Sequence, residues 1–585
     1  MQISNIDYKV HFKYQFMQNQ DWKLQLLTDY LDKWAKETPE QVAIIQHEDN
    51  RFVSYKKLKS LSEFFALKLI EMGIKKGDII VTQLALFPEH IALMYACMRI
   101  GAIFSPIDLR LKKEEVRRDL DKIAPKMFFF HGKTPQIDFN EIGEHVRDNC
   151  PYIKYLIQVL VNPKIEEPIK GAITIQQMMS KPSLVMLKLK DVFTGRLEKM
   201  TKGIDTKTPT VIIFTTGTTG PPKPALMSHE NIIVQNEILM QGTNMSRNDR
   251  TLVNLPTSHV GCLTEAMLST FYGGGTAVFL KVFNVELSLQ AIEKHKVTLL
   301  GQIPTQFRMM WADPNYQKYD LSSIRFAIYG GSSVEVEFLN KLASMAPNFG
   351  TGLGMTETAG FSTFTPRGIS VEEMAGQVGR YFEHLGKVTI RKPMKEDGSA
   401  GDALPDGETG EICYHPPIVF MGYYNFSEAT KKAISTDGIL YSGDIGYFKD
   451  MGSYNALYLS GREKFIIKQK GFQVFPDEVQ AFISSHPKVH EADVIGIKHK
   501  LFDEGIFAFV RPKPGLELIA DEIMTHCNNI AAYKRPIHIE IWPSDKPFPL
   551  TRSAKTDKLV LKNEAEQIVE KLRNNGLWDA QSSGI

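Results

Sequence analysis

The sequence predicts an α/β fold with a compact β-rich subdomain and a smaller α+β unit at its C-terminal end. Helix-like and strand-like segments alternate from about residue 24 to 135, and the alternation continues to residue 329. Strand, helix, strand order implies parallel pairing. Between residues 390 and 470, short strands and many Gly, Pro and Asp turns indicate the β-rich subdomain. The 585 residues allow roughly three or four domains or subdomains.

The first elements follow one another closely. Residues 58–72 have apolar side chains at helical spacing, and Gly73 is a good helix stop. Residues 78–83 (DIIVTQ) are typical of a buried strand. A helix at 90–99 and a strand at 102–106 are expected next.

The remaining elements continue this order. Further strands are predicted at residues 211–214, 276–280, 297–300 and 325–329. After about residue 464 we expect a helix at 477–484, strands at 491–497 and 507–512, and a stiff, Pro-rich loop at 543–549.

Composition argues against several classes of function. Lys plus Arg number 69 and Asp plus Glu 67, so the net charge is only +2 and nucleic acid is not an expected partner. The N-terminal residues lack the continuous apolar stretch of a signal peptide. No run reaches the roughly 18 apolar residues of a membrane span. The cysteines have no C-x-x-C spacing, which predicts reduced thiols in a cytoplasmic protein. They are Cys97, Cys150, Cys262, Cys413 and Cys527.

A basic, amphipathic stretch spans residues 184–207. Its basic side chains include Lys188, Lys190, Arg196 and Lys199, with Lys202 close behind. Such a stretch is usually a solvated surface excursion, and contact with a membrane or a partner is the alternative. The sequence leaves its role open, as it does the oligomeric state.

The segment TTGTTGPPKPA (residues 215–225) has the composition of a phosphate-binding loop. It follows an apolar strand at 211–214 and precedes a helix expected from Ser228. Glycines let backbone N–H groups approach phosphate oxygens, hydroxyls donate hydrogen bonds, and Lys223 supplies a positive charge. The lysine follows proline rather than glycine, so this is not a Walker loop. A flexible turn is the alternative. The residues expected at the phosphates are Thr215, Thr216, Gly217, Thr218, Thr219, Gly220 and Lys223.

This loop resembles the signature loop of the acyl-adenylate-forming superfamily. That superfamily contains acyl-CoA synthetases, 4-coumarate–CoA ligases, firefly luciferase and peptide-synthetase adenylation domains. Pro224 is a departure, because members usually have glycine after the lysine. The resemblance runs from about residue 24 to 560. It implies a large ATP- and acid-binding domain over residues 1–463, with its β-rich part barrel-like, and a small mobile α+β domain over residues 464–585.

The same resemblance implies the nucleotide contacts. In GLGMTET (residues 352–358), Thr356 is expected at the α-phosphate and Glu357 is expected to hold Mg²⁺, which prefers carboxylate and phosphate oxygens. In YSGDIG (residues 441–446), Asp444 is expected to accept hydrogen bonds from both ribose hydroxyls, and Arg462 to reach the ribose. Leu353 stands where an aromatic residue commonly stacks on adenine. The other expected nucleotide contacts are Gly331, Ser332, Ser333, Gly354, Met355 and Lys468.

Two more sets of residues follow from the resemblance. The acyl pocket is expected to be lined by His259, Val260, Gly261, Tyr329, Gly330 and Gly354, with Cys262 and Met355 beside them. Lys464 is expected as the hinge, and the coenzyme A side is expected to carry Gly471, Phe472 and Gln473. FPLTRSAKTDK (residues 548–558) resembles the loop that carries the adenylation lysine, here Lys555. Ala554 replaces the usual glycine before it.

The resemblance implies an AMP-forming acid–CoA ligase of fatty acid or aromatic acid metabolism. The acid would attack the α-phosphate of ATP, pyrophosphate would leave, and coenzyme A would then take the acyl group from the adenylate. Lys555, Thr356, Glu357 and Lys223 are the implied catalytic residues. A carrier protein or oxygen as acceptor, and a non-catalytic nucleotide-binding relative, are the alternatives. The pocket candidates are small, apolar or aromatic and include no second cation, which favours a medium-chain, cyclic or aromatic monocarboxylic acid.

Overall fold

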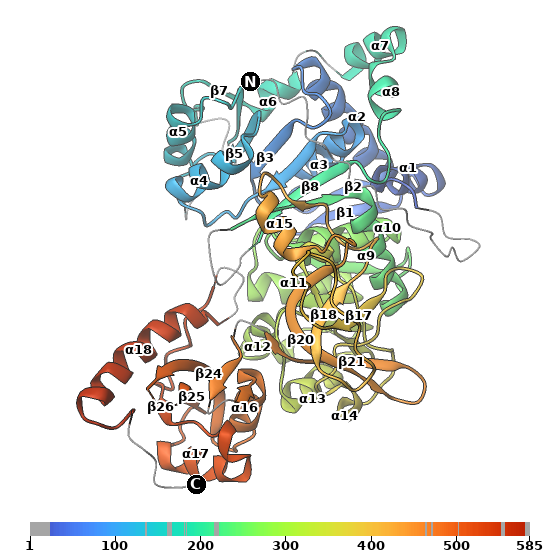
Figure 1. Cartoon of the computed structure of the whole chain (residues 1–585). Coiled ribbons are helices and arrows are strands. Elements are labelled where there is room, and N and C mark those ends of the chain that lie inside the picture. Colours follow the sequence, from blue (N-terminus) through green and yellow to red (C-terminus); the bar gives the residue numbers. More distant parts are fainter. Residues whose placement is uncertain are drawn as a thin grey trace.

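The computed structural model contains two large mixed sheets, a four-stranded antiparallel sheet and a separate C-terminal sheet (Figure 1). It describes residues 24–134, 137–160, 166–180, 182, 184–215, 222–462, 465–469, 472–500, 502–551 and 556–579. The α/β class, the β-rich subdomain and the C-terminal α+β unit predicted from the sequence are confirmed. Each predicted helix and strand is found, with ends that shift by at most four residues.

The eight-stranded sheet is parallel at its centre, as strand–helix–strand order predicted. Its order is β19 (Gly422–Tyr423), β9 (Pro224–Ser228), β8 (Pro209–Phe214), β4 (Ile103–Pro106), β3 (Ile79–Gln83), β5 (Met127–His131), β6 (Tyr155–Val159) and β7 (Ala172–Thr174). β3 pairs with β4 and β5 in parallel, whereas β9 runs antiparallel to both β8 and β19.

The seven-stranded sheet combines segments far apart in the sequence. Its order is β14 (Phe349–Gly350), β13 (Phe326–Tyr329), β12 (Leu299–Gln302), β10 (Arg250–Val253), β11 (Thr276–Phe279), β1 (Val42–Gln46) and β2 (Arg51–Ser54). β1 pairs in parallel with β11, so Ile44 lies opposite Ala277. The first strand of the chain therefore leaves its sequence neighbours and joins the far sheet.

Helices cover both faces of these two sheets. Neighbouring residues of β1 show this, because Ile44 belongs to the core between the sheets and Ile45 to the core on the outer face. Between the sheets lie α1 (Leu27–Glu37), α2 (Tyr55–Glu71), α3 (Pro88–Ile100), α9 (His229–Thr243), the π-helical segment η1 (Gly261–Leu268) and α10 (Ser269–Tyr272). On the outer faces lie α4 (Lys113–Ile123) and α5 (Asn140–Asn149) on one sheet, and α11 (Val285–His295), α12 (Pro304–Trp311) and α13 (Val336–Met345) on the other.

Local sequence sets the helix ends. Ser228 caps α9: its hydroxyl accepts from the Asn231 N–H, and the Asn231 side chain accepts from the Ser228 N–H. α2 ends before Gly73, whose φ of +77° is left-handed. Short helices complete the large domain. They are α6 (Ile175–Ser180), α7 (Leu184–Thr194), α8 (Arg196–Thr201), α14 (Val371–Met374) and α15 (Ser427–Ala433).

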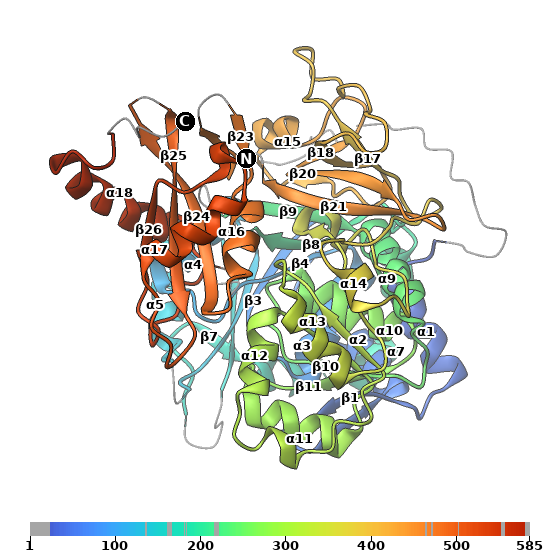
Figure 2. The ribbon, with the colours of Figure 1, turned by 90° about the horizontal axis from the view of Figure 1, so that it is seen from below.

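The β-rich subdomain is an antiparallel sheet rather than the barrel-like unit expected. Its strand order is β17 (Val388–Arg391), β18 (Gly410–Tyr414), β20 (Leu440–Asp450) and β21 (Asn455–Arg462). The C-terminal sheet has the order β23 (Phe472–Val474), β22 (Ile467–Gln469), β25 (Asp503–Pro512) and β24 (Val489–His499), with β26 (His538–Ile541) parallel to β25. Its helices are α16 (Pro476–Ser484), α17 (Ala520–His526) and α18 (Lys558–Asn574). In Figure 2 both sheets lie on the same side of the large domain.

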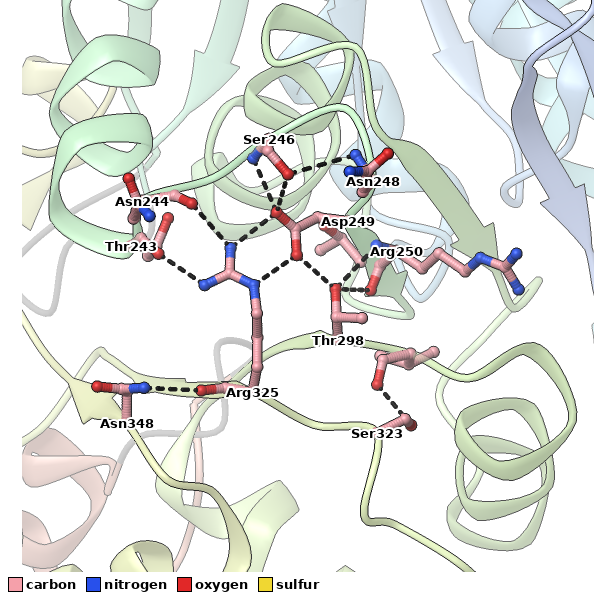
Figure 3. A network of polar contacts seen from close by, with 12 residues as sticks. Thr243, Asn244, Ser246, Asn248, Asp249, Arg250, Thr298, Ser323, Arg325 and Asn348 are labelled. Atoms are coloured by element: carbon pink, nitrogen blue, oxygen red, sulfur yellow. Dashed lines mark hydrogen bonds and ion pairs between the residues drawn. The ribbon is translucent and has the colours of Figure 1, made fainter.

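A partly buried ion pair connects the amino ends of three strands in the seven-stranded sheet. Asp249, before β10, accepts bonds of 2.6 and 2.7 Å from the Arg325 guanidinium, which precedes β13. Thr298, before β12, donates to the same carboxylate at 2.7 Å. Arg325 also donates to the carbonyls of Thr243 and Asn244 at the end of α9 (Figure 3). This network anchors the strands whose opposite ends carry Tyr329 and its neighbours.

No helix in the described part of the chain combines the length and the apolar character needed to cross a bilayer. All five cysteines are free and buried, as predicted.

Candidate active site

Glu357 is the centre of a buried polar cluster. It lies in a short helical turn, η3 (Thr356–Thr358), between the hairpin strands β15 (Gly354–Met355) and β16 (Gly360–Phe361). The Tyr423 hydroxyl donates to Glu357 Oε1 at 2.6 Å. Lys223 Nζ lies 4.2 Å from the centroid of the Tyr423 ring. Burial raises the pKa of Glu357, and the Tyr423 hydrogen bond and the Lys223 charge oppose that rise only in part.

Backbone bonds fix this cluster from three segments. The Phe420 N–H donates to the Glu357 carbonyl at 2.9 Å, and the Tyr424 N–H donates to the Pro224 carbonyl at 2.8 Å. Tyr423 itself belongs to β19, which pairs with β9. The segment from 420 to 424 therefore holds the Glu357 turn against β9, the strand that follows the glycine-rich loop predicted to bind phosphate.

The base of that loop is closed by Thr215 and Lys223. The Thr215 N–H donates to the Lys223 carbonyl at 2.8 Å, and the Lys223 N–H donates to Thr215 Oγ1 at 3.3 Å. Lys122 Nζ donates to the Pro222 carbonyl at 2.6 Å, a contact that the sequence did not indicate. The predicted phosphate contacts Thr216, Gly217, Thr218, Thr219 and Gly220 lie outside the described residues.

A strand that the sequence did not predict follows this loop, and the helix expected from Ser228 begins at His229. The loop does not lead directly into a helix, because Pro224–Ser228 forms β9 and pairs antiparallel with β8. The five residues PALMS are too short and mixed to show a strand period. Pro224 lies opposite Phe214 in the ladder, so the departure from glycine falls in a strand rather than in the loop.

Asp444 and Arg462 form a second polar pair. They lie opposite each other on the antiparallel strands β20 and β21, and Arg462 Nε donates to Asp444 Oδ1 at 2.7 Å. Asp444 is buried, whereas 40% of the Arg462 side chain is exposed. A fixed carboxylate beside an accessible guanidinium suits recognition of a vicinal diol.

Glycines allow the hairpin that carries Glu357 to pack closely. A Cβ on Gly354 would overlap the Gly360 carbonyl, and a Cβ on Gly330 would lie 2.8 Å from Phe361 Cζ. Leu353 is partly buried, and its carbonyl accepts from the Ser362 N–H at 2.9 Å. Met355 is held in the hairpin by its N–H, which donates to Thr358 Oγ1 at 3.0 Å.

The end of β13 is buried, whereas the residues 331–333 that follow it are exposed. Tyr329 ends β13 as a buried side chain, and its carbonyl accepts from Thr351 Oγ1 at 2.8 Å. Gly331 has a φ of +93°, and Gly331, Ser332 and Ser333 are exposed.

His259 meets a charged pair that the sequence did not reveal. Its Nε2 lies 4.0 Å from Asp108 Oδ2, and Arg110 binds both Asp108 oxygens at 2.9 and 2.6 Å. Burial raises the pKa of Asp108, but the Arg110 hydrogen bonds outweigh it and hold that pKa below its usual range. Asp108 follows parallel strand β4, and this position is the signal that could have found it.

An acidic side chain adjoins the predicted acyl wall. Val260 and Gly261 lie half-exposed at the start of η1, and Cys262 is buried. A Cβ on Gly261 would lie 3.6 Å from Glu265 Oε2, and one on Gly360 would lie 2.6 Å from Glu265 Oε1. Glu265 was not among the residues predicted from the sequence. π-Helical turns such as η1 occur often at functional sites.

Comparisons with known proteins match this architecture. Residues 31–424 match the model of the AMP-binding enzyme family, and residues 478–555 match the AMP-binding enzyme C-terminal domain. The chain belongs to the AMP-binding enzyme family. It is an AMP-forming ligase of the acyl-CoA synthetase class.

Two relatives and one solved structure illustrate the likeness. The chain is 30% identical to a probable 4-coumarate–CoA ligase 2 of Dictyostelium discoideum, over 86% of this chain and 89% of the relative. It is 28% identical to the indoleacetate–CoA ligase of Aromatoleum aromaticum, over 87% and 93% respectively. The structure of ATP-bound MatB from Rhodopseudomonas palustris matches with a TM-score of 0.78 at 22% identity, covering 93% of this chain and all of that one, which shows the shared fold.

The C-terminal residues expected in this AMP-binding enzyme are only partly described. Lys468 lies on β22 with an exposed side chain, and its N–H donates to Glu504 Oε2 at 2.8 Å. Phe472 and Gln473 belong to β23. Lys464, Gly471 and Lys555 lie outside the described residues.

The donor set of this AMP-binding enzyme fits Mg²⁺. The described residues contain no group of three or more His, Cys, Asp or Glu side chains that could enclose a metal. Mg²⁺ does not need one, because it commonly binds one or two carboxylates together with substrate phosphates. Glu357 offers one such carboxylate near the Lys223 ammonium.

Proposed function

We propose that the protein joins a carboxylic acid to coenzyme A with cleavage of ATP to AMP and pyrophosphate. The observation that carries this proposal is the cluster of Glu357, Tyr423 and Lys223 at the base of the glycine-rich loop. It supplies a carboxylate for a metal and a cation for phosphate oxygens. Family membership supports ATP and coenzyme A as the other two substrates.

In this proposal, some residues bind the nucleotide and others stabilise charge during the reaction. Asp444 and Arg462 bind the ribose, the loop from Thr215 to Lys223 holds the phosphates, and Thr356 contacts the α-phosphate. A Mg²⁺ ion on Glu357 neutralises charge on the phosphate oxygens when bound. Lys223 and Lys555 stabilise the negative charge that develops while the acid oxygen attacks the α-phosphate and pyrophosphate leaves.

In the second half-reaction, a different surface of the C-terminal domain faces the site. The coenzyme A thiolate attacks the acyl carbon and AMP leaves. We assign residues 1–463 to the fixed domain and 464–585 to a domain that turns about Lys464. This turn withdraws Lys555 and presents Lys468, Gly471, Phe472 and Gln473. The free, buried cysteines support a cytoplasmic location.

The acid is a medium-chain, cyclic or aromatic monocarboxylate in this proposal. The relatives named for indoleacetate and 4-coumarate support a ring-bearing acid. The Glu265 carboxylate beside Gly261 and Gly360 supports a single carboxyl group, because a second one near it would be repelled. His259, Val260, Tyr329 and Gly330 are assigned to the same pocket.

A panel of acids tests both parts of the proposal. Acid-dependent AMP release is measured with and without coenzyme A, using fatty acids of increasing length, arylacetates, cinnamates and dicarboxylates. We expect ring-bearing or medium-chain monocarboxylates to give coenzyme A-dependent release. If the rate of AMP release were the same with and without coenzyme A, coenzyme A would be excluded as the acceptor. A preference for dicarboxylates would exclude the pocket assignment while leaving the ligase chemistry intact.

A further inference from the structure

Helix α7 turns an apolar face toward solvent. Val192 and Phe193 are 79% and 86% exposed, and Val185, Met186 and Leu189 are each more than half exposed. A surface helix normally turns its apolar stripe inward. Contiguous exposed apolar side chains mark a site of association. Figure 1 shows α7 at the periphery of the large domain, beyond α2.

The periodicity of α7 makes this face continuous. At 100° per residue, these five side chains occupy an arc of about 120° that contains no polar residue. Lys188 borders one edge of the arc and Lys190 the other. Leu187, on the opposite side, is only 3% exposed. The helix is therefore amphipathic, with most of its apolar surface on the outside.

Specific contacts hold the helix in this orientation. Leu187 packs with Phe64 and Leu67 of α2 in a small separate core. Lys190 pairs with Glu71 of α2 at 2.9 Å, and Lys188 pairs with Glu63 at 3.2 Å. The two lysines that border the apolar arc therefore tie it back to the domain.

The surroundings of this face are positively charged. Residues 184–207 contain six basic and three acidic residues, and α2 contains four basic and two acidic residues. Their combined net charge is +5, against +2 for the whole chain. An apolar arc inside a basic zone complements the surface of a lipid bilayer. The acyl chains of the bilayer are apolar, and its headgroups can be anionic.

We propose that α7 is a membrane-surface anchor that inserts its apolar arc between anionic lipid headgroups. Five side chains on one short helix are few for a protein partner, since a standard interface uses about 20–30 residues on each side. They suffice for a helix lying in the headgroup region, where the net positive charge of the surrounding segments attracts anionic headgroups. This proposal does not depend on the identity of the acid.

Vesicle flotation of the full chain tests the anchor. Vesicles of phosphatidylcholine alone are compared with vesicles that also contain phosphatidylglycerol, at low and high salt. We expect binding to the anionic vesicles that weakens with salt. Val192→Asp combined with Phe193→Asp should lower the partition coefficient at least about 10²-fold, because two apolar groups would enter the lipid as charges. Lys199→Glu combined with Lys202→Glu should lower it only for anionic vesicles.

Two matched substitutions control for exposed apolar residues in general. Ile519 and Val282 are 60% and 57% exposed on other parts of the surface, so Ile519→Asp and Val282→Asp should bind vesicles as the unchanged protein does. Acid-dependent exchange of pyrophosphate into ATP, measured without vesicles, checks that each variant is folded. Equal binding by the Val192/Phe193 variant, or no binding by the unchanged protein, overturns the proposal. Self-association through α7 without vesicle binding would assign the face to a second copy and also overturn it.

Discussion

At the scale of single residues, burial gives Glu357 two opposed effects. We propose it as the carboxylate that holds Mg²⁺, yet burial raises its pKa and so disfavours the carboxylate form. A carboxyl group with a raised pKa in the folded state lowers the stability of the protein as the pH rises from its unfolded pKa through its folded pKa. Activity and stability are therefore expected to respond in opposite directions when its charge is removed.

Glu357→Gln tests this opposition. We expect adenylation to fall about 10²-fold or more, because one preorganised electrostatic partner is lost. The difference in thermal midpoint, Glu357→Gln minus the unchanged protein, should increase with pH. At higher pH the unchanged protein must bury an ionised carboxylate, whereas the variant buries a neutral amide. Pyrophosphate exchange over a Mg²⁺ titration and melting at several pH values measure the two effects.

A matched control exists elsewhere in the same domain. Glu373 Oε1 also accepts a hydrogen bond from a tyrosine, Tyr454, at 2.9 Å, on the side of the domain that carries α14. Glu373→Gln should leave the Mg²⁺ dependence unchanged. An unaltered rate and Mg²⁺ requirement in Glu357→Gln would remove Glu357 from the site.

Single residues also show what the sequence can reveal. Glu357, Asp444 and Lys223 were predicted as site residues because they belong to motifs with a strong resemblance, and this assignment stays a prediction. Tyr423 and Glu265 were not predicted, because their roles come from a contact across 66 positions and from the packing of a hairpin against a helix. Asp108 could be suspected from its place after β4, but its contact with His259 could not. No local period or motif encodes such contacts.

At the scale of elements, the Asp249–Arg325 network joins three strands to α9. Burial raises the pKa of Asp249, but Arg325, Thr298 and the Ser246 N–H outweigh it and lower the pKa. A depressed carboxyl pKa contributes stability that is present above the unfolded value and is lost as the pH falls through the folded value. The network should therefore stabilise the sheet at neutral pH and fail in acid.

Asp249→Asn should lower the free energy of unfolding by about 3 kcal/mol at neutral pH, because it leaves Arg325 without its charged partner. The difference from the unchanged protein should shrink toward acid pH. Chemical denaturation followed by fluorescence measures it. Asp320→Asn, which removes an exposed partner of Lys296, is the control and should change stability little. Equal stability of both variants at neutral pH would mean that the network adds nothing to the sheet.

Element prediction succeeded where a helical period or an apolar run filled the whole element. α2 and β3 were predicted because a helical period or an apolar run spans the whole element. β9 was missed because its five residues come directly after a Gly- and Pro-rich loop and have mixed polarity. The π-helical form of η1 was missed because no sequence period distinguishes it from an α-helix. The partner of β1 was also unpredictable, since an apolar strand fits either sheet.

At the scale of the whole molecule, the two half-reactions are expected to need different arrangements of the two domains. Lys555→Ala should reduce pyrophosphate exchange about 10²–10³-fold, because the positive charge is lost at the attacked phosphate. Transfer from a chemically prepared acyl-adenylate to coenzyme A should remain, since by then the small domain has turned. Lys546→Ala, an exposed lysine on the preceding Pro-rich segment, is the control for both assays.

The outcomes of this experiment are distinct. Equal loss of both half-reactions in Lys555→Ala would indicate a single static arrangement. Normal rates of both would make Lys555 a surface lysine. Lys464→Pro provides the converse test, because fixing φ at the hinge should spare exchange and suppress transfer.

The pairing of β1 with β11 affects how the chain folds during synthesis. Val42–Gln46 leaves the ribosome more than 200 residues before Thr276–Phe279, the strand it pairs with in parallel. Until then β2 alone can pair with it, and a two-stranded ribbon is marginally stable. The nascent chain thus carries an apolar strand edge for about half of the translation of the large domain, while chaperones and other nascent chains are close to it. Mutations that slow translation between residues 46 and 276 should therefore lower the yield of folded protein more than equal delays after residue 467, where β22 to β26 pair over shorter distances.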